Sequence, residues 1–296
     1  MARTSCDWLL VDGSSLIFRA FYGVPGSVRS PSGRQINAVR GFLDTLARLV
    51  STRNPRHVAV AADDDWRPDW RVALIPQYKA QRTAEPVPPL LEPQFPVIWD
   101  HLDAIGVDHA GLPDYEAEDV VATWAAEATG TVEIASGDRD LFALVEEGRV
   151  SVLYPERSGL ALVDETEVTR RYGVPGRRYP DFAVLRGDPS DGLPGLRGVG
   201  PAAAASLLRA HGDIEGVIAN ARLSDEQRDY LRRAVQIVMP QRSLPIALPH
   251  GSRRGYPAEP ERLTELMREY GTDSPVAHLV QALNDVVAQP AQSSPA

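Results

Sequence analysis

The sequence predicts an α/β fold with a mostly parallel central sheet flanked by helices, followed by a helical region. Two observations lead to this prediction. Short apolar runs typical of strands alternate with segments of helical periodicity up to about residue 155, as in parallel sheets covered by helices. From Asp181 onward the pattern is helical, and successive segments are separated by Gly and Pro.

Each element of the first half is predicted from its own pattern. Apolar runs predict strands at 7–11, 57–62, 131–135 and 150–153. Apolar residues at helical spacing predict helices over 36–50, 94–105 and 117–128. The stretch RTAEPVPPLLEPQFP, residues 82–96, contains five prolines and cannot form one regular helix. We expect a loop or a short helical excursion there, and long irregular insertions are often functional.

The second half is predicted to be helical throughout. Its helices correspond to the segments DFAVLRG, PAAAASLLRAHG, IEGVIANA, DEQRDYLRRAVQIV and PERLTELMREYG. The predicted organisation is therefore a core over residues 1–180, a helical region over 181–287 that supports it, and a disordered tail over 288–296.

Composition restricts the class of protein. With 296 residues and 43% hydrophobic content, the chain can bury a sizeable core. It contains no apolar run near the roughly 18 residues of a membrane span, and its N-terminus has no secretory hydrophobic region. Cys6 is the single cysteine, which excludes an intramolecular disulfide and a cysteine-based zinc site. We expect a cytoplasmic, monomeric protein without a membrane partner.

The net charge of −9 does not exclude nucleic acid, because the charges are unevenly distributed. Residues 177–254 contain twelve Arg against eight Asp or Glu, a local excess of four positive charges. The chain has thirty Arg and one lysine, Lys79. This lysine indicates a position that needs a compact ammonium group, and its retention by chance is an equal alternative. The second half of the chain is thus locally basic, although the chain as a whole is acidic.

Nine carboxylates occur in five clusters, and four of these clusters directly follow predicted strands. They are Asp12, one of Asp63 and Asp64, Glu116 with Glu118 and Asp119, Asp138 with Asp140, and Asp188 with Asp191. Because parallel strands end at the same edge of a sheet, acids at their ends converge in one crevice. Like charges at that distance repel unless cations lie among them. The sequence therefore predicts a site for divalent metal ions.

Each acidic motif alone also has a purely structural interpretation. The motif DGSS is a common turn with a helix N-cap, and it occurs in phosphatases that use an aspartate nucleophile. Acids in DYEAED complement a helix dipole, and SGDRD is compatible with a solvated loop. The stretch GDPSDGLPGLRGVGPAAA is more specific, because two acids precede a Gly-x-Gly turn that enters a helix. Such a hairpin can hold a DNA phosphate through backbone N–H groups without reading sequence.

Basic and aromatic side chains flank the acidic motifs. Candidate contacts for a phosphate are Arg19, Arg71, Lys79 and Arg82. Candidate rings for stacking on an unpaired base are Tyr22, Trp66, Trp70 and Tyr78. The histidines form no metal-binding pattern, and GxxxxGK[ST] is absent, which argues against nucleotide hydrolysis of the P-loop kind.

The ordered series of motifs resembles the 5′-nuclease or flap endonuclease family, and most of all the bacterial 5′–3′ exonuclease that also forms the N-terminal domain of DNA polymerase I. The motifs are VDGSSLIFRAF, D-x-x-x-P-x-x-R from Asp64 to Arg71, YKAQR, DYEAED, SGDRD and GDPSDGLPGLRGVG. The resemblance covers about residues 7–250. No polymerase domain follows, so we expect a free-standing version.

The resemblance implies a PIN-like nuclease core, a helix–three-turn–helix module beyond it, and an arch at about residues 79–100. The metal ligands that it implies are Asp12, Asp64, Glu116, Glu118, Asp119, Asp138, Asp140, Asp188 and Asp191. Asp64 is preferred over Asp63 because its spacing to Pro68 and Arg71 fits the motif. The implied catalytic cations are Lys79, Arg82 and Arg19. The implied DNA contacts are Arg71, Tyr78, Arg197, Gly198, Val199, Gly200 and Ala202.

The expected function is hydrolysis of DNA phosphodiesters in replication and repair by a structure-specific 5′-nuclease. Its cofactors would be two or more Mg²⁺ or Mn²⁺ ions, with a monovalent cation at the helix–three-turn–helix. Its partners would be DNA molecules with 5′ flaps, recessed 5′ ends or nicks. The alternatives are a non-catalytic module that binds branched DNA and a PIN-type RNase. The chain departs from the family pattern at Glu118, at Gly192 in place of a usual Asn, and in GVGPAAA, which lacks a lysine.

Overall fold

The computed structural model describes residues 5–83, 87–157 and 159–288. Its centre is a six-stranded sheet with the order β3-β2-β1-β4-β5-β6. The strands are β1 (Trp8–Asp12), β2 (His57–Ala61), β3 (Asp108–Ala110), β4 (Val132–Ala135), β5 (Val150–Glu156) and β6 (Gly159–Val163). All neighbouring strands pair in parallel except β5 and β6, which are antiparallel. The predicted α/β class and mostly parallel sheet are confirmed.

Helices cover both faces of the sheet because successive strand residues point to opposite sides. In β1, Leu9 and Val11 belong to one core cluster, while Trp8 and Leu10 belong to the other. The first face packs against α1 (Gly13–Gly23), α2 (Asn37–Arg53) and α4 (Gln94–Ile105). The second face packs against α5 (Ala117–Glu127) and α7 (Tyr179–Arg186). Shorter elements lie between them: α3 (Asp69–Leu74), η1 (Ala80–Thr83), η2 (Asp140–Leu144), α6 (Glu165–Tyr172) and η3 (Gly176–Arg178).

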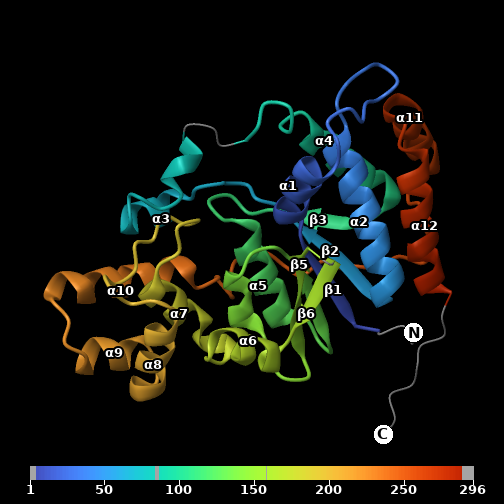
Figure 1. Cartoon of the computed structure of the whole chain (residues 1–296). Helices are drawn as coiled ribbons and strands as arrows, with labels where there is room; N and C mark the ends of the chain where they lie inside the picture. The colour runs from blue at the N-terminus through green and yellow to red at the C-terminus, as the bar shows by residue number, and fades with distance from the viewer. Residues whose placement is uncertain (1–4, 84–86, 158, 289–296) are drawn as a thin grey trace, which may run out of the picture.

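The helical region divides into two groups that lie on different sides of the molecule (Figure 1). Helices α8 (Pro201–His211), α9 (Ile214–Asn220) and α10 (Asp225–Val238) group with α7. Helices α11 (Pro260–Tyr270) and α12 (Asp273–Val287) instead pack on α4 and α2 of the core. The expectation of one helical region over 181–287 therefore requires correction, because the apolar faces of α11 and α12 complete the first core cluster.

The predicted arch at about 79–100 extends too far toward the C-terminus. Residues from Gln94 onward form α4, whose Gln94, Val97 and Ile98 are buried in the core. The preceding part contains η1, and residues 84–86 lie outside the described ranges. The predicted disordered tail, 288–296, also lies outside them except for Ala288. No helix in the described ranges has the length and apolar character that a bilayer span requires.

Packing of α12 on α2 predicts that the C-terminal helices contribute to the stability of the core. Leu279 is fully buried at this contact, so Leu279→Ala should lower the free energy of unfolding by about 2–5 kcal/mol. Val287, on the same helix, is 40% exposed, so Val287→Ala should change the free energy of unfolding by less than about 0.5 kcal/mol. Urea unfolding followed by circular dichroism measures both; equal, small effects would contradict the packing.

Candidate metal centre and nuclease site

Eight carboxylates line one cavity of about 610 Å³ at the carboxyl edge of the parallel strands. They are Asp12, Asp63, Glu116, Glu118, Asp138, Asp140, Asp188 and Asp191. Lys79, Arg82 and Arg139 line the same cavity and supply positive charge. The predicted convergence of acids at strand ends is thus present, since β1, β2 and β4 all end at this edge.

Asp12 has both of the roles that its motif allowed. As the N-cap of α1, its Oδ1 accepts a hydrogen bond from the backbone N–H of Ser15 at 3.0 Å. Its Oδ2 accepts one from the hydroxyl of Ser136, which follows β4, at 2.5 Å. Burial raises the pKa of Asp12 to about 6 despite these donors. The cap therefore orients a carboxylate that also lines the cavity.

Asp63, and not Asp64, faces the acidic cavity. Asp63 Oδ1 accepts a hydrogen bond from the backbone N–H of Ala117 at 2.6 Å, which points its carboxylate at the N-terminus of α5. Burial, followed by repulsion from Glu116, raises the pKa of Asp63 to about 7. The side chain of Asp64 is exposed and does not line the cavity. The preference for Asp64 is corrected, because the turn after β2 directs the first of the two acids inward.

The tightest group of acids consists of Glu118, Asp138 and Asp140. Each offers a carboxylate oxygen, and these oxygens all lie within 4.8 Å of one another. Burial raises the pKa of Asp140, and the neighbouring Asp138 raises it further. Burial likewise raises the pKa of Glu118, against the opposing effect of Arg71. Three carboxylate oxygens at this spacing are suited to a hard divalent cation.

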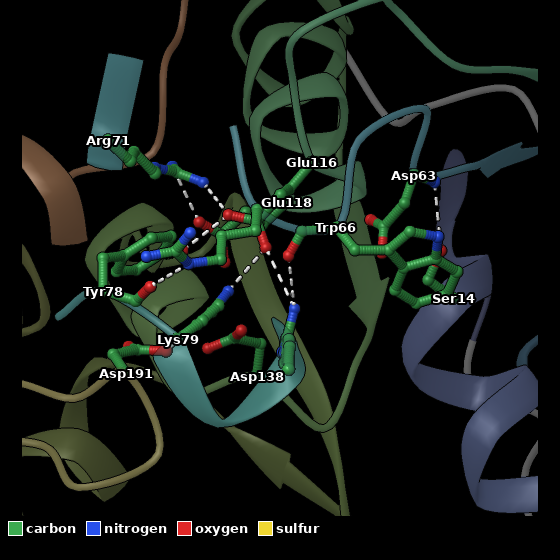
Figure 2. A network of polar contacts seen from close by, with 12 residues as sticks. Ser14, Asp63, Trp66, Arg71, Tyr78, Lys79, Glu116, Glu118, Asp138 and Asp191 are labelled. Atoms are coloured by element: carbon green, nitrogen blue, oxygen red, sulfur yellow. Dashed lines mark hydrogen bonds and ion pairs between the residues drawn. The ribbon is translucent and has the colours of Figure 1, made fainter. Parts of the chain in front are cut away.

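Glu116 is neutralised by the protein itself. Its carboxylate accepts hydrogen bonds from Lys79 Nζ and the Tyr78 hydroxyl, both at 2.6 Å, and forms an ion pair with Arg71 (Figure 2). Arg82 lies 3.4 Å from the same carboxylate. Burial would raise the pKa of Glu116, but the charges of Lys79 and Arg71 outweigh it and lower the pKa to about 2.

Arg71 and Tyr78 were expected to contact DNA, and the structure corrects both assignments. Their exposed fractions are 0% and 1%, so neither reaches the surface. Besides Glu116, the Arg71 guanidinium pairs with Glu118 at 2.8 Å and with Asp119 at 2.9 Å. It also lies 4.9 Å from the Trp70 ring centre. Arg71 is therefore a buried counterion of the acids and not a surface contact.

Asp119 was expected to bind metal but lies behind the cavity. It is fully buried, and its Oδ1 accepts a hydrogen bond from the backbone N–H of Gln241 at 2.9 Å in addition to pairing with Arg71. It does not line the cavity. The correction follows from the helical geometry of α5, which begins at Ala117 and directs Glu118 and Asp119 to different sides.

Asp188 and Asp191 belong to the turn between α7 and the predicted hairpin, and they have different partners. Asp188 pairs with Arg139 at 3.2 Å and with Arg186 at 3.3 Å. Asp191 lies 3.7 Å from Lys79 Nζ, and burial raises its pKa to about 6. Arg139 was missed by the sequence analysis, although its position between two cavity acids in SGDRD was a usable signal.

The remaining predicted residues lie at the surface. Arg19 is exposed, donates a hydrogen bond to the Glu156 carbonyl at 3.4 Å, and does not line the acidic cavity. In the hairpin, Gly198 has a φ of +81° and Gly200 is the N-cap of α8. The hairpin residues Arg197, Gly198, Gly200 and Ala202 are exposed, and Val199 is half-buried. The predicted hairpin is therefore accessible to a ligand.

The raised pKa values predict that stability falls with increasing pH when no metal is bound. For Asp12, Asp63 and Asp191 the folded-state pKa exceeds the ordinary value, so the folded chain binds more protons than the unfolded chain between those values. In EDTA, the free energy of unfolding should therefore decrease between about pH 4 and pH 7. The lowered pKa of Glu116 acts at more acidic pH, where its contribution is lost.

Urea unfolding across this pH range in EDTA measures the slope. Asp63→Asn removes one group whose pKa is raised in the folded state, so it should make the slope shallower. Stability that stays level or increases with pH in EDTA would contradict the account.

Comparison with known proteins identifies the family. A family model of the 5′-3′ exonuclease N-terminal resolvase-like domain matches residues 7–173, and one of the 5′-3′ exonuclease C-terminal SAM fold matches residues 174–245. A 5′-3′ exonuclease of Streptomyces coelicolor is 47% identical over 83% of this chain and 91% of its own. One of Mycobacterium tuberculosis is 41% identical over 93% of this chain and 97% of its own.

A solved structure agrees at the level of the fold. The flap endonuclease D15 of bacteriophage T5, in a pseudo-enzyme-product complex with DNA and metal ions, aligns with a TM-score of 0.64. It covers 95% of this chain and 99% of its own at 15% identity. The resemblance inferred from the ordered motifs is thus confirmed, and the chain belongs to the 5′–3′ exonuclease family and is a nuclease.

Proposed function

We propose that this nuclease cleaves DNA at 5′ flaps, recessed 5′ ends and nicks, with two or more Mg²⁺ or Mn²⁺ ions. The observation that carries the proposal is the group Glu118, Asp138 and Asp140 inside the acidic cavity, with Lys79 and Arg82 at the same cavity. The T5 flap endonuclease, which was solved as a complex with DNA and metal ions, supports a substrate and cofactor of this kind.

The donor set fits hard divalent ions. All the acids that line the cavity offer oxygen, which is the ligand that Mg²⁺ and Mn²⁺ prefer. Glu118, Asp138 and Asp140 would hold one ion, and the other lining carboxylates, among them Asp12, Asp63 and Asp191, would extend the site. When bound, such ions activate a water and stabilise the leaving oxygen.

Two basic side chains are placed to stabilise charge on the scissile phosphate. The Lys79 ammonium is buried in the cavity wall and contacts Glu116 and Asp191. Arg82 is more accessible, with 34% of its side chain exposed, and its guanidinium is also held by the Trp66 carbonyl at 2.9 Å. Positive charge that is fixed in place before the reaction stabilises developing negative charge strongly. Arg19 lies at the surface, outside this cavity.

The hairpin before α8 would bind the DNA duplex at a site outside the cavity. Its exposed glycines leave backbone N–H groups accessible, and Arg197 adds a positive charge. The hairpin, Gly198 to Gly200, would also hold a monovalent cation, which would add positive charge next to the DNA backbone. Contacts to the backbone alone give binding that recognises DNA shape and weakens steeply with salt.

Replacing acids that face the cavity should separate cleavage from binding. Asp138→Asn, Asp140→Asn and Asp63→Asn each remove a cavity carboxylate. Loss of an outer contact to a metal ligand already costs about 10–100-fold, so loss of a cavity carboxylate should lower the cleavage rate at least about 100-fold, with flap binding retained. The control Asp64→Asn alters an exposed neighbour and should cut at the rate of the wild type. An inactive Asp64→Asn beside an active Asp63→Asn would contradict the assignment.

The proposed function is tested by cutting a 5′-labelled flap duplex and a matching single-stranded RNA in Mg²⁺, in Mn²⁺ and in EDTA. We expect cleavage near the flap junction in either metal, none in EDTA, and little cleavage of the RNA. Tight flap binding without cleavage in either metal would indicate a branched-DNA-binding module instead. Preferential RNA cleavage would indicate a PIN-type RNase.

A further inference from the structure

Gly192 lies where the turn from Asp188 to Leu193 meets the segment that carries Lys79. Its φ is +72°, in the left-handed region that favours glycine. A Cβ at this position would lie 2.2 Å from the carbonyl oxygen of Gln77 and 3.5 Å from the amide nitrogen of Lys79. The shorter distance is well inside van der Waals contact, so in this chain, which has glycine where the resembled family usually has Asn, a side chain would force one of the two backbones to move.

Hydrogen bonds join the same two segments next to Gly192. The backbone N–H of Lys79 donates to the Asp191 carbonyl at 3.0 Å. The side-chain amide of Gln81 donates to the Ser190 carbonyl at 2.6 Å. Three successive residues of the turn, 190 to 192, therefore contact the segment from Gln77 to Gln81, and the close approach at Gly192 lies at one end of this contact.

Lys79 has an unusual backbone conformation within that segment. Its φ is +44°, which is uncommon for a residue with a long side chain and persists only where surrounding contacts hold it. In this conformation the ammonium lies 2.6 Å from Glu116 and 3.7 Å from Asp191, and the side chain points into the group of acids (Figure 2). The contacts with the turn are among those that hold the strained residue.

We propose that Gly192 is a positioning residue for Lys79. By leaving room for the Gln77 carbonyl, it lets the segment dock on the turn and fixes the Lys79 ammonium in the acidic cavity. Gly192 acts through Lys79 and has no part in binding the metal or DNA itself. The effect on catalysis rests on the proposed function. The position of Lys79 does not, because it can be measured without DNA.

Lys79 is the single lysine of the chain, so protein labelled with carbon-13 at the lysine ε-carbon gives one side-chain lysine signal. In Gly192→Ala we expect this signal to move from its wild-type position. The matched control is Gly148→Ala, where φ is +68° and a Cβ would meet nothing within 4 Å, so it introduces the same backbone strain without a contact. The lysine signal should stay in place in the control.

A second variant guards against failure of Gly192→Ala to fold. Gln81 is exposed, and Gln81→Ala removes only its hydrogen bond to the Ser190 carbonyl. This variant should fold normally and move the lysine signal in the same direction by a smaller amount. An unmoved signal in a folded Gly192→Ala protein, or in Gln81→Ala if the first variant does not fold, would overturn the proposal.

Single-turnover cleavage of the flap duplex measures the catalytic consequence. Displacing a positioned group can cost about 100-fold, and we expect Gly192→Ala to lower the rate at least about tenfold. In a Lys79→Ala background the same change should lower the rate less than about twofold, because the effect passes through Lys79. A full additional loss in that background would overturn the proposal and favour an effect through Asp191. If the lysine signal moves in Gly192→Ala but the wild type does not cut flaps, the positioning role stands and the proposed function is rejected.

Discussion

A buried guanidinium balances the acidic edge of the sheet before any ion binds. Arg71 is fully enclosed and contacts Glu116, Glu118 and Asp119, which come from the start of α5. Three carboxylates this close could not all be charged without it, and an isolated guanidinium at this depth would be equally unfavourable. The short helix α3 and the start of α5 therefore depend on each other, and the positions of the cavity acids depend on both.

The acids differ in whether a basic side chain neutralises their charge. Acids with a basic partner stabilise the fold, and acids without one are available to bind a cation. Asp119 and Asp188 are paired with arginines, and Glu116 is paired with Lys79 as well as Arg71. In the described ranges, by contrast, no basic side chain forms an ion pair with Asp12, Asp63, Asp138 or Asp140. Asp138 and Asp140 differ from the other unpaired acids in their spacing, because their oxygens lie within 4.8 Å of each other and of Glu118, which keeps its contact with Arg71. This group is therefore the best placed to hold an external cation.

Much of this arrangement could be predicted because it depends on periodicity and on the shared edge of parallel strands. The strands β1, β2, β4 and β5 and the convergence of acids follow from that logic. Strand β3, with the short polar sequence DHA, lacks the apolar pattern of a buried strand and was missed. Strand β6, with the sequence GLALV, was also missed, although its apolar run was a usable signal. The choice between Asp63 and Asp64 depends on the turn after β2. The burial of Arg71 depends on Glu116, 45 residues away, and a single charge in a sequence resembles a surface residue.

The most direct test of the central claim is calorimetric titration of the DNA-free protein with Mn²⁺ in two buffers of different ionisation enthalpy. The account predicts binding that releases protons at about pH 6, because Asp12, Asp63 and Asp191 have pKa values of about 6, 7 and 6 and must lose protons beside a cation. It also predicts that Asp140→Asn weakens this binding. Absence of Mn²⁺ binding, or binding that is equally tight in Asp140→Asn and releases no protons, would contradict the assignment of the cavity as a metal centre.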